Sequence, residues 1–211
     1  MFDREVALYL YKCLLRRRQA LSILKPISSN EAFDIALEQI SEMLSQEDID
    51  EANKVLAVAN AGKIDIYIDA STLYHNDLSL PHQASISFII YKESSKLYQK
   101  AEVLGDNVTI LIGGKPVTIE MTVNVAEYMA LIRALEFLYD NNINGNITIY
   151  SDSLLVVSQV NFTSSTKSPK LVALRDYVTR LKNNLGNVQV VHLNREQNTE
   201  ADALAKSVNT G

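Results

Sequence analysis

The chain has 211 residues, of which 47% are hydrophobic and 21% charged, so it can bury a core and is not a disordered protein. Its single cysteine excludes an internal disulfide and a cysteine-based zinc cluster, and no apolar stretch approaches the roughly 20 residues that cross a bilayer. The net charge of −5 argues mildly against a nucleic-acid partner. No membrane partner is expected, and a cytoplasmic location is the default expectation.

Residues 1–61 are predicted to form a small all-helical module. Apolar residues recur at helical spacing from Phe2 to Leu24, and Pro26 ends this helix. The segment Ser28-Ser29-Asn30-Glu31 has the pattern of a capping box and opens a second helix. The apolar face of this second helix would consist of Phe33, Leu37, Ile40 and Leu44. A third helix is predicted from Ser45 to Gly62, with an inward face of Ile49, Ala52, Leu56 and Ala59.

Charge is unevenly divided within this helical module. Residues 1–25 hold six basic and two acidic residues, whereas residues 26–62 hold one basic and eight acidic residues. Three interpretations stay open: two solvated helix faces that attract each other, a phosphate-binding helix that uses Arg16, Arg17 and Arg18, or a surface for a protein partner, including dimerisation.

After Gly62 the apolar pattern changes from helical to alternating. Ile64, Ile66 and Ile68 alternate with polar residues, which predicts a strand that ends at Asp69. Further strands are predicted over 84–91, 97–104, 146–150 and 188–193, and a stretch over 108–119, turning at Gly113-Gly114, would extend the antiparallel part. Helices are predicted over 126–139, from 154, over 169–185 and over 200–208. This order predicts an α/β domain over residues 62–211, with a mixed sheet and helices on both faces.

Four acidic residues are more informative together than singly. Asp69 and Asp152 each follow an apolar strand, and Glu127 and Asp202 lie on predicted helices. Taken singly, each has a plainer explanation: a sheet-edge position, a helix N-cap, a first-turn charge that suits the helix dipole, or a solvated helix residue. Carboxylates gathered at the strand ends would repel one another unless a hard cation held them, and Mg²⁺ prefers such ligands. The pattern therefore predicts a two-metal site, whose cations would reverse the local acidic field.

Four segments resemble the signature blocks of type 1 ribonuclease H. They are Ile68-Asp69-Ala70-Ser71, Asn124-Val125-Ala126-Glu127, Tyr150-Ser151-Asp152-Ser153, and the run from Asn198 to Ala205. The resemblance covers about residues 63–208 and implies a ribonuclease H-like mixed five-stranded sheet with helices on both faces. It also implies an endonuclease that hydrolyses the RNA strand of RNA–DNA hybrids with two Mg²⁺ ions, for which Mn²⁺ can substitute, leaving 5′-phosphate and 3′-hydroxyl ends.

The resemblance assigns roles to individual residues. The metal ligands would be Asp69, Glu127, Asp152 and Asp202. Asn124 matches a position that reads RNA 2′-hydroxyls, Thr122 and Ser153 match positions near the DNA-strand phosphate, and Ser71 is a further candidate substrate contact.

A fifth catalytic side chain is expected in the loop before the last helix. Arg195 is favoured over His192, because a guanidinium suits phosphate and the alternation of the strand places His192 within the sheet. The glycine-rich turn that the family carries after the first aspartate is replaced here by residues 70–76. The basic protrusion of some relatives also has no counterpart, so the chain is most similar to the short archaeal and bacterial members.

Other functions stay open at this point. The same fold serves other nucleases and transposases, and a non-catalytic nucleic-acid-binding module could also keep it. Double-stranded RNA is an open second substrate.

Overall fold

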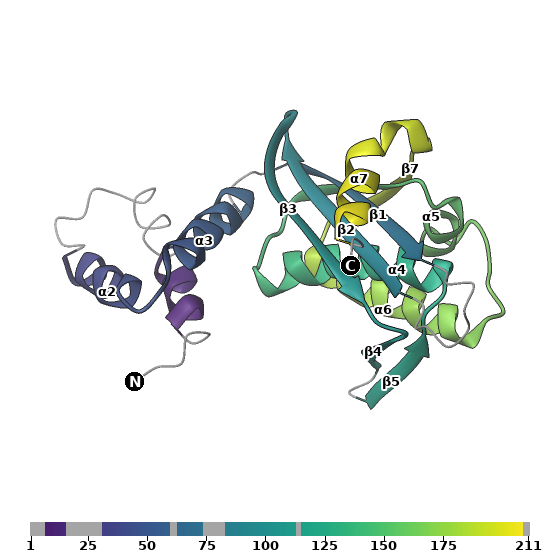
Figure 1. Ribbon diagram of the computed structural model, residues 1–211, viewed down its shortest axis with the longest axis horizontal. Helices are drawn as coiled ribbons and strands as arrows, with labels where there is room; N and C mark the ends of the chain where they lie inside the picture. Colours follow the sequence, from purple (N-terminus) through teal and green to yellow (C-terminus); the bar gives the residue numbers. More distant parts are fainter. Residues whose placement is uncertain (1–6, 16–30, 60–62, 74–82, 113–114, 209–211) are drawn as a thin grey trace. The chain divides into compact units, whose positions relative to one another are not determined.

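The computed structural model describes residues 7–15, 31–59, 63–73, 83–112 and 115–208, and the chain divides into two compact units, Met1–Asn60 and Ala61–Gly211 (Figure 1). In these described ranges no helix is both long and apolar enough to cross a membrane. The predicted segments Arg16 to Arg18, Ser28 to Asn30 and Gly113-Gly114 lie outside the described residues.

The first unit contains helices, as predicted. Residues 7–15 are helical, followed by α2 (Glu31–Ser41) and α3 (Gln46–Ala59). Its buried cluster consists of Tyr11, Leu37 and Ala52. The predicted cap at Ser45 is present: the Ser45 amide donates to Asp48 Oδ2 and the Asp48 amide donates to Ser45 Oγ, both at 3.2 Å. The predicted inward face of α3 is correct at Ala52, which is buried, and at Ile49, which packs against the buried cluster. It is incomplete, because Val55 and Val58 are also buried, whereas Leu56 is half-buried.

The second unit is built on the predicted five-stranded mixed sheet, whose strand order is β3-β2-β1-β6-β7. Its strands are β1 (Lys63–Leu73), β2 (Gln83–Lys92), β3 (Ser95–Leu104), β6 (Asn146–Ser151) and β7 (Val188–His192). The first three strands pair antiparallel, and β6 joins β1 in parallel and carries β7 in parallel on its other edge. The carboxyl ends of β1 and β6 therefore lie at the same edge of the sheet.

One prediction about the sheet is wrong. The stretch over 108–119 forms β4 (Asn107–Ile112) and β5 (Lys115–Glu120), which pair only with each other as a separate two-stranded sheet. Alternation predicted the two strands correctly but carries no information about which edge they pair with.

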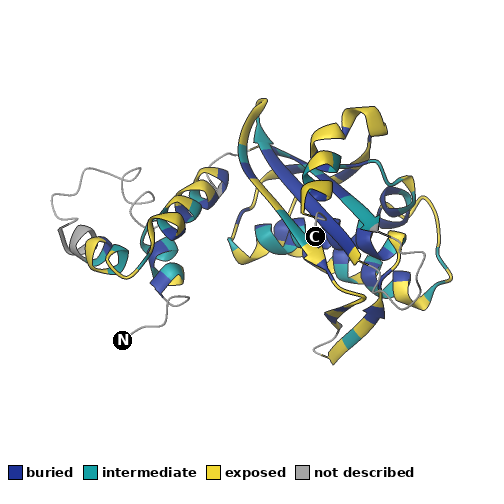
Figure 2. Ribbon diagram, in the orientation of Figure 1, coloured by how far each residue is buried: buried dark blue, intermediate teal, exposed yellow. Residues whose placement is uncertain are grey.

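Helices cover both faces of the five-stranded sheet. They are α4 (Val123–Asp140), α5 (Leu154–Val160), α6 (Pro169–Leu185) and α7 (Thr199–Ser207), with a short 3₁₀ helix, η1 (Arg195–Gln197), before the last. Both α4 and α7 contact β1 and β2, and β2 is buried at every position from Ala84 to Ile90 (Figure 2). Burial on both faces explains why β2 carries only apolar residues and two small serines from Ala84 to Ile90.

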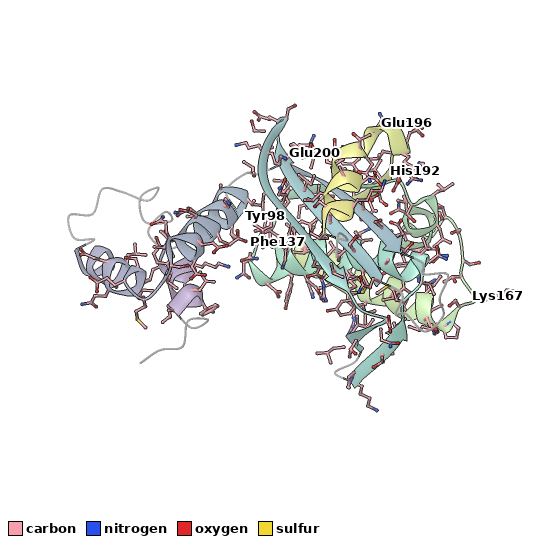
Figure 3. All side chains as sticks on the ribbon, in the orientation of Figure 1. Tyr98, Phe137, Lys167, His192, Glu196 and Glu200 are labelled. Atoms are coloured by element: carbon pink, nitrogen blue, oxygen red, sulfur yellow. The ribbon has the colours of Figure 1, made fainter. Side chains whose placement is uncertain are left out.

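The two faces of the sheet differ in chemistry. Ile68 is fully buried and pairs with Phe88, whose ring lies 5.3 Å from the Phe137 ring of α4. Tyr98 of β3 stacks on the same ring at 4.5 Å, so an aromatic cluster fixes α4 to this face (Figure 3). Alternation then places Asp69 on the opposite face, under α7.

Candidate functional site

Asp69 and Asp152 lie level with each other at the ends of neighbouring parallel strands. The register pairs Tyr67 of β1 with Tyr150 of β6, and each aspartate comes two residues later. The rings of these tyrosines stack with centroids 5.0 Å apart, which fixes the two strands at this height. Asp69 is only 3% exposed, and Asp152 is half-buried just beyond the last residue of β6.

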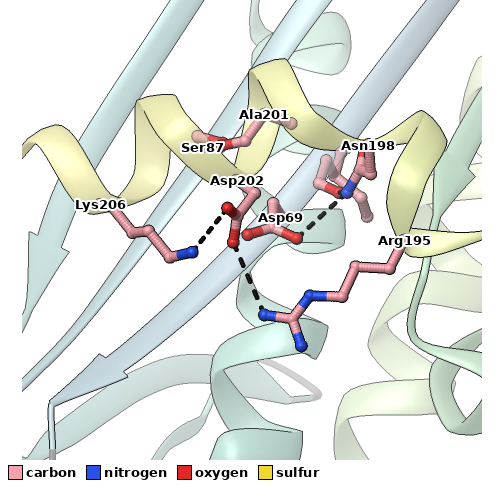
Figure 4. A network of polar contacts seen from close by, with 8 residues as sticks. Asp69, Ser87, Arg195, Asn198, Ala201, Asp202 and Lys206 are labelled. Carbon is pink, nitrogen blue, oxygen red and sulfur yellow. Dashed lines mark hydrogen bonds and ion pairs between the residues drawn. The ribbon is translucent and has the colours of Figure 1, made fainter.

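Two buried serines hold α7 against the sheet and thereby position Asp202. The Ser85 hydroxyl donates to the Ala205 carbonyl oxygen at 2.6 Å, and the Ser87 hydroxyl donates to the Ala201 carbonyl oxygen at 2.8 Å. Ser87 is the register partner of Asp69, so the turn of α7 that carries Asp202 passes directly beside it (Figure 4). Small polar residues on β2 allow this close approach of the helix.

Asn198 links α7 to the strand that carries Asp69. Its side chain is 1% exposed, and its amide nitrogen donates both to the Ile68 carbonyl oxygen at 2.9 Å and to Asp69 Oδ1 at 3.1 Å (Figure 4). Asn198 is the N-cap residue of α7 but makes no side-chain capping bond, and its buried Oδ1, the atom that would accept one, has no hydrogen-bond partner. The sequence carries one signal for this role, an Asn at a helix start four positions before Asp202, which was not recognised apart from its motif.

Glu127 approaches the site from α4. The helix begins at Val123, three residues earlier than predicted, with Thr122 as its N-cap. Glu127 therefore lies in the second turn and not in the first, so the helix-dipole explanation for its position is wrong. Burial raises the pKa of Glu127 to about 8, and the charges of Asp69 and Asp152 raise it while that of Arg195 lowers it.

Asp69 lies at the centre of this charge cluster. Burial, and after it the negative charges of Asp152 and Asp202, raise its pKa to about 7, while the hydrogen bond from Asn198 opposes the shift. The pKa values of Asp69 and Glu127 are each raised by the charges of other carboxylates in this set. The structure therefore brings the four predicted acids close to one another. Such crowding is unfavourable without a compensating cation.

The donor set fits a hard divalent cation. Asp69 Oδ2 and Glu127 Oε2 are buried oxygens with no hydrogen-bond partner, and oxygens in this position are expected to have a ligand. In the arrangement of the described residues, however, no three His, Cys, Asp or Glu side chains are placed so that together they could hold a metal ion. At Asp202, the carboxylate oxygens contact cations of the chain itself.

Asp202 has two cationic neighbours. Lys206, one helical turn later, contacts Asp202 Oδ2 at 2.6 Å, and Arg195 lies 3.8 Å from Asp202 Oδ1 (Figure 4). The Arg195 side chain is 74% exposed and free to turn toward the solvent. Lys206 was not among the predicted site residues, although an acid and a lysine four residues apart on a helix are a recognisable ion-pair signal.

The prediction that His192 lies packed within the sheet is wrong. His192 is the last residue of β7, and its side chain is exposed, because the inward alternation of Val188 and Val190 stops where the strand ends (Figure 3). Arg195, by contrast, lies in η1, beyond the strand and close to the carboxylates.

The predicted substrate contacts lie around the carboxylates on separate elements. Thr122 accepts a capping hydrogen bond from the Val125 amide at 3.2 Å, and Asn124 is half-buried in the first turn of α4. Ser153 is the N-cap of α5 and makes no side-chain capping bond. Ser71 is half-buried on β1, two residues after Asp69 and therefore on the same face of that strand.

Comparison with known proteins finds a matching family model and several solved structures similar to this chain. A family model described as reverse transcriptase-like matches residues 83–208, a range that begins after Asp69 and includes the other three acids. The RNase H1 of the halophilic archaeon Halobacterium salinarum is 25% identical with a TM-score of 0.56, over 70% of this chain and 98% of that one. LC11-RNase H1, isolated from compost, is 30% identical with a TM-score of 0.56, over 69% of this chain and 94% of its own. The same enzyme in complex with an RNA/DNA hybrid matches at 29% identity and a TM-score of 0.55, over 68% and 94% of the two chains.

Proposed function

This chain belongs to the reverse transcriptase-like family, and its sheet domain resembles type 1 ribonucleases H. From this relationship we propose that it is an endonuclease that hydrolyses the RNA strand of RNA–DNA hybrids. The observation that carries the proposal is the cluster of four acids at the ends of β1 and β6, where two buried carboxylate oxygens lack partners. The hybrid bound by LC11-RNase H1 is consistent with this substrate class.

The four carboxylates would hold two divalent cations, Mg²⁺ or in its place Mn²⁺. When bound, such ions supply an activated water and stabilise the leaving oxygen of an in-line displacement, which leaves a 5′-phosphate and a 3′-hydroxyl. The ligands proposed are Asp69, Glu127, Asp152 and Asp202. Asn198 would keep the Asp69 carboxylate in one orientation, because its amide is fixed at the same time to the backbone of β1.

Other residues would place the substrate. Arg195 is proposed as an electrostatic helper, because its guanidinium is exposed, suits phosphate as a hydrogen-bond donor and lies beside the carboxylates. Thr122 already accepts a hydrogen bond from the helix, so its hydroxyl hydrogen remains free to donate to a DNA phosphate, and Ser153 is placed for the same role. Asn124 would recognise a 2′-hydroxyl, the group that distinguishes RNA from DNA, and Ser71 would contact the same strand.

A cleavage assay tests this function directly. Labelled RNA–DNA, RNA–RNA and DNA–DNA duplexes are incubated with the protein and Mg²⁺ or Mn²⁺, and with excess chelator as the control. The proposal expects cleavage of the RNA strand of the hybrid, loss of cleavage in chelator, and loss in Asp152→Asn but not in Asp106→Asn, an exposed acid in the turn before β4. Cleavage of DNA–DNA at the same rate would favour another nuclease on this fold. Binding without cleavage would favour a non-catalytic module.

The helical unit at residues 1–61 is proposed to assist binding of nucleic acid, with a protein partner as the alternative. The basis is the charge of residues 1–25, where six basic residues face two acidic ones. Replacing Arg16, Arg17 and Arg18 by Ala should weaken hybrid binding and flatten its dependence on salt, because fewer counterions are released. An unchanged salt slope would favour a protein partner. A cytoplasmic location is likewise part of the proposal, with the single cysteine as its support.

A further inference from the structure

Phe162, at the end of α5, has an unusual combination of backbone and exposure. Its φ angle is +58°, in the left-handed region that bulky residues rarely adopt, and its side chain is 63% exposed. A Gly or Asn would fit this turn without strain, and an exposed phenyl ring gains little from burial. Strained backbone of this kind persists mainly where a side chain is held in place for function.

The ring of Phe162 lies between the end of α5 and one side of α6. The guanidinium carbon of Arg175 is 5.4 Å from the ring centroid, a cation–π distance. A cavity of about 310 Å³ adjoins the ring. Its lining, besides Phe162, is Val160, Asn161, Thr179, Lys182 and Asn183. One wall is thus aromatic, and the others carry hydroxyl, amide and ammonium groups.

The charge of this cavity is positive. Lys182 is half-buried, and no carboxylate forms an ion pair with it among the residues that the structure describes. No acidic residue lines the cavity. Arg175 is paired with its exposed neighbour Asp176 at 2.9 Å, and Lys167, in the loop between α5 and α6, is exposed at the outer edge of the domain (Figure 3). An aromatic face beside unpaired positive charge is complementary to a nucleotide, which has a planar base and an anionic phosphate.

We propose that Phe162 and the cavity beside it bind an unpaired nucleotide of the nucleic acid, with the base stacked on the Phe162 ring and the phosphate beside Lys182. This inference rests on the proposed function for its substrate class. Helix α5 begins two residues after Asp152 and has seven residues, so it is about 10 Å long at about 1.5 Å per residue. That length corresponds to about three nucleotides of stacked strand. A single-stranded overhang that leaves the carboxylate site can therefore reach Phe162.

The test compares two labelled hybrids, one blunt and one with a short single-stranded overhang, by fluorescence anisotropy. Phe162→Gly should weaken binding of the overhang hybrid about tenfold, as expected for one lost stacking contact. The same variant should melt at a higher temperature than wild type, because Gly adopts positive φ without strain. Higher stability with lower affinity separates a binding role from a structural one. Phe162→Asn serves as a second variant, since Asn also tolerates this backbone conformation.

Three further variants sharpen the result. Phe162→Tyr keeps an aromatic face and should retain the affinity for the overhang. Lys182→Gln should reduce the salt slope of overhang binding by about one counterion. Tyr139→Ala removes another exposed aromatic residue, on α4, and is the matched control that should leave overhang binding unchanged.

Equal affinity of Phe162→Gly and wild type for the overhang hybrid would overturn the inference. So would a loss that is as large for the blunt hybrid, or displacement of the overhang by an acidic peptide at equal concentration. Cleavage is measured separately on the blunt hybrid. A wild-type protein that binds the overhang through Phe162 but cuts no hybrid would contradict the proposed function and still support this site.

Discussion

Replacing Asp69 by Asn should make the metal-free protein more stable at neutral pH, although the same change should abolish turnover. Burial and the neighbouring carboxylates raise the pKa of Asp69 from 3.8 to about 7. At about 1.4 kcal/mol per pKa unit, this shift corresponds to at most about 4 kcal/mol of unfavourable free energy in the ionised folded state. Asn keeps the size and the oxygen that accepts from Asn198, and removes the charge. Since an uncharged amide still loses hydration on burial, we expect a gain of about 2–4 kcal/mol.

The gain should depend on pH in a defined direction. In the unfolded chain Asp69 loses its proton near pH 3.8, whereas in the folded domain it keeps the proton until about pH 7. The stability that Asp69 contributes to the wild-type protein is therefore fully present below about pH 4. It is lost as pH rises through about 7, so the free energy of unfolding of the wild type falls over this range. The Asn variant lacks this titration. Wild type and variant should have similar stability near pH 4 and differ most above pH 7.

Thermal unfolding measured by circular dichroism in chelator, at pH 4 and at pH 8, checks this expectation. A gain of about 2–4 kcal/mol should raise the Tm at pH 8 by about 4–16 °C in a domain of this size. Adding Mg²⁺ should stabilise the wild type and have less effect on Asp69→Asn, because one ligand is lost. Asp106→Asn removes an exposed charge and should change little. An Asp69→Asn variant that is less stable than wild type at pH 8, or equally shifted at both pH values, would refute the reasoning.

Changes at four further positions have defined outcomes. Tyr128→Phe removes a buried hydroxyl that donates to the Gln159 side-chain oxygen at 2.8 Å, and should lower the free energy of unfolding by about 1–2 kcal/mol in a urea titration. Thr122→Ala removes the N-cap of α4 and should destabilise by about 1 kcal/mol, with Thr122→Ser as the variant that restores both stability and activity. Arg195→Ala should lower the turnover number several-fold at unchanged Tm. His192→Ala should change neither the turnover number nor the Tm, since His192 is exposed. A large loss of turnover in His192→Ala alone would reverse the two roles.

The sequence predicted those parts of the site that depend on local pattern. Asp69 and Asp152 follow apolar strands, and parallel strands place such residues at one edge, so their proximity was predictable. The bond from Asn198 to Asp69 was not predictable, because it joins residues 129 positions apart and depends on how closely α7 packs on β2. The resemblance to a family placed Asp202 in the site, whereas its ion pair with Lys206 depends on side-chain orientation.

The same distinction applies to the fold. Apolar alternation predicted β1 and β2, and proline and helical spacing placed α6 at its observed bounds, Pro169–Leu185. Alternation could not predict that β4 and β5 would leave the main sheet, since pairing partners depend on edges formed elsewhere in the chain. Phe162 is another case: a residue type that disfavours positive φ gives no sign that it will occupy such a turn.

The sheet order also governs how the domain comes together as it is synthesised. β2 pairs with β1 and β3 soon after these strands emerge, but the other edge of β1 waits for β6, whose partner residues follow the whole of α4. Until then, the apolar strand β1 has unpaired backbone hydrogen-bonding groups along one edge. Exposed edges of this kind can pair with other nascent chains. The serine contacts that hold α7 form last, and with them arrives the fourth carboxylate. Under the proposed function, hydrolytic activity would therefore appear only with this final step of folding and could be used to time it.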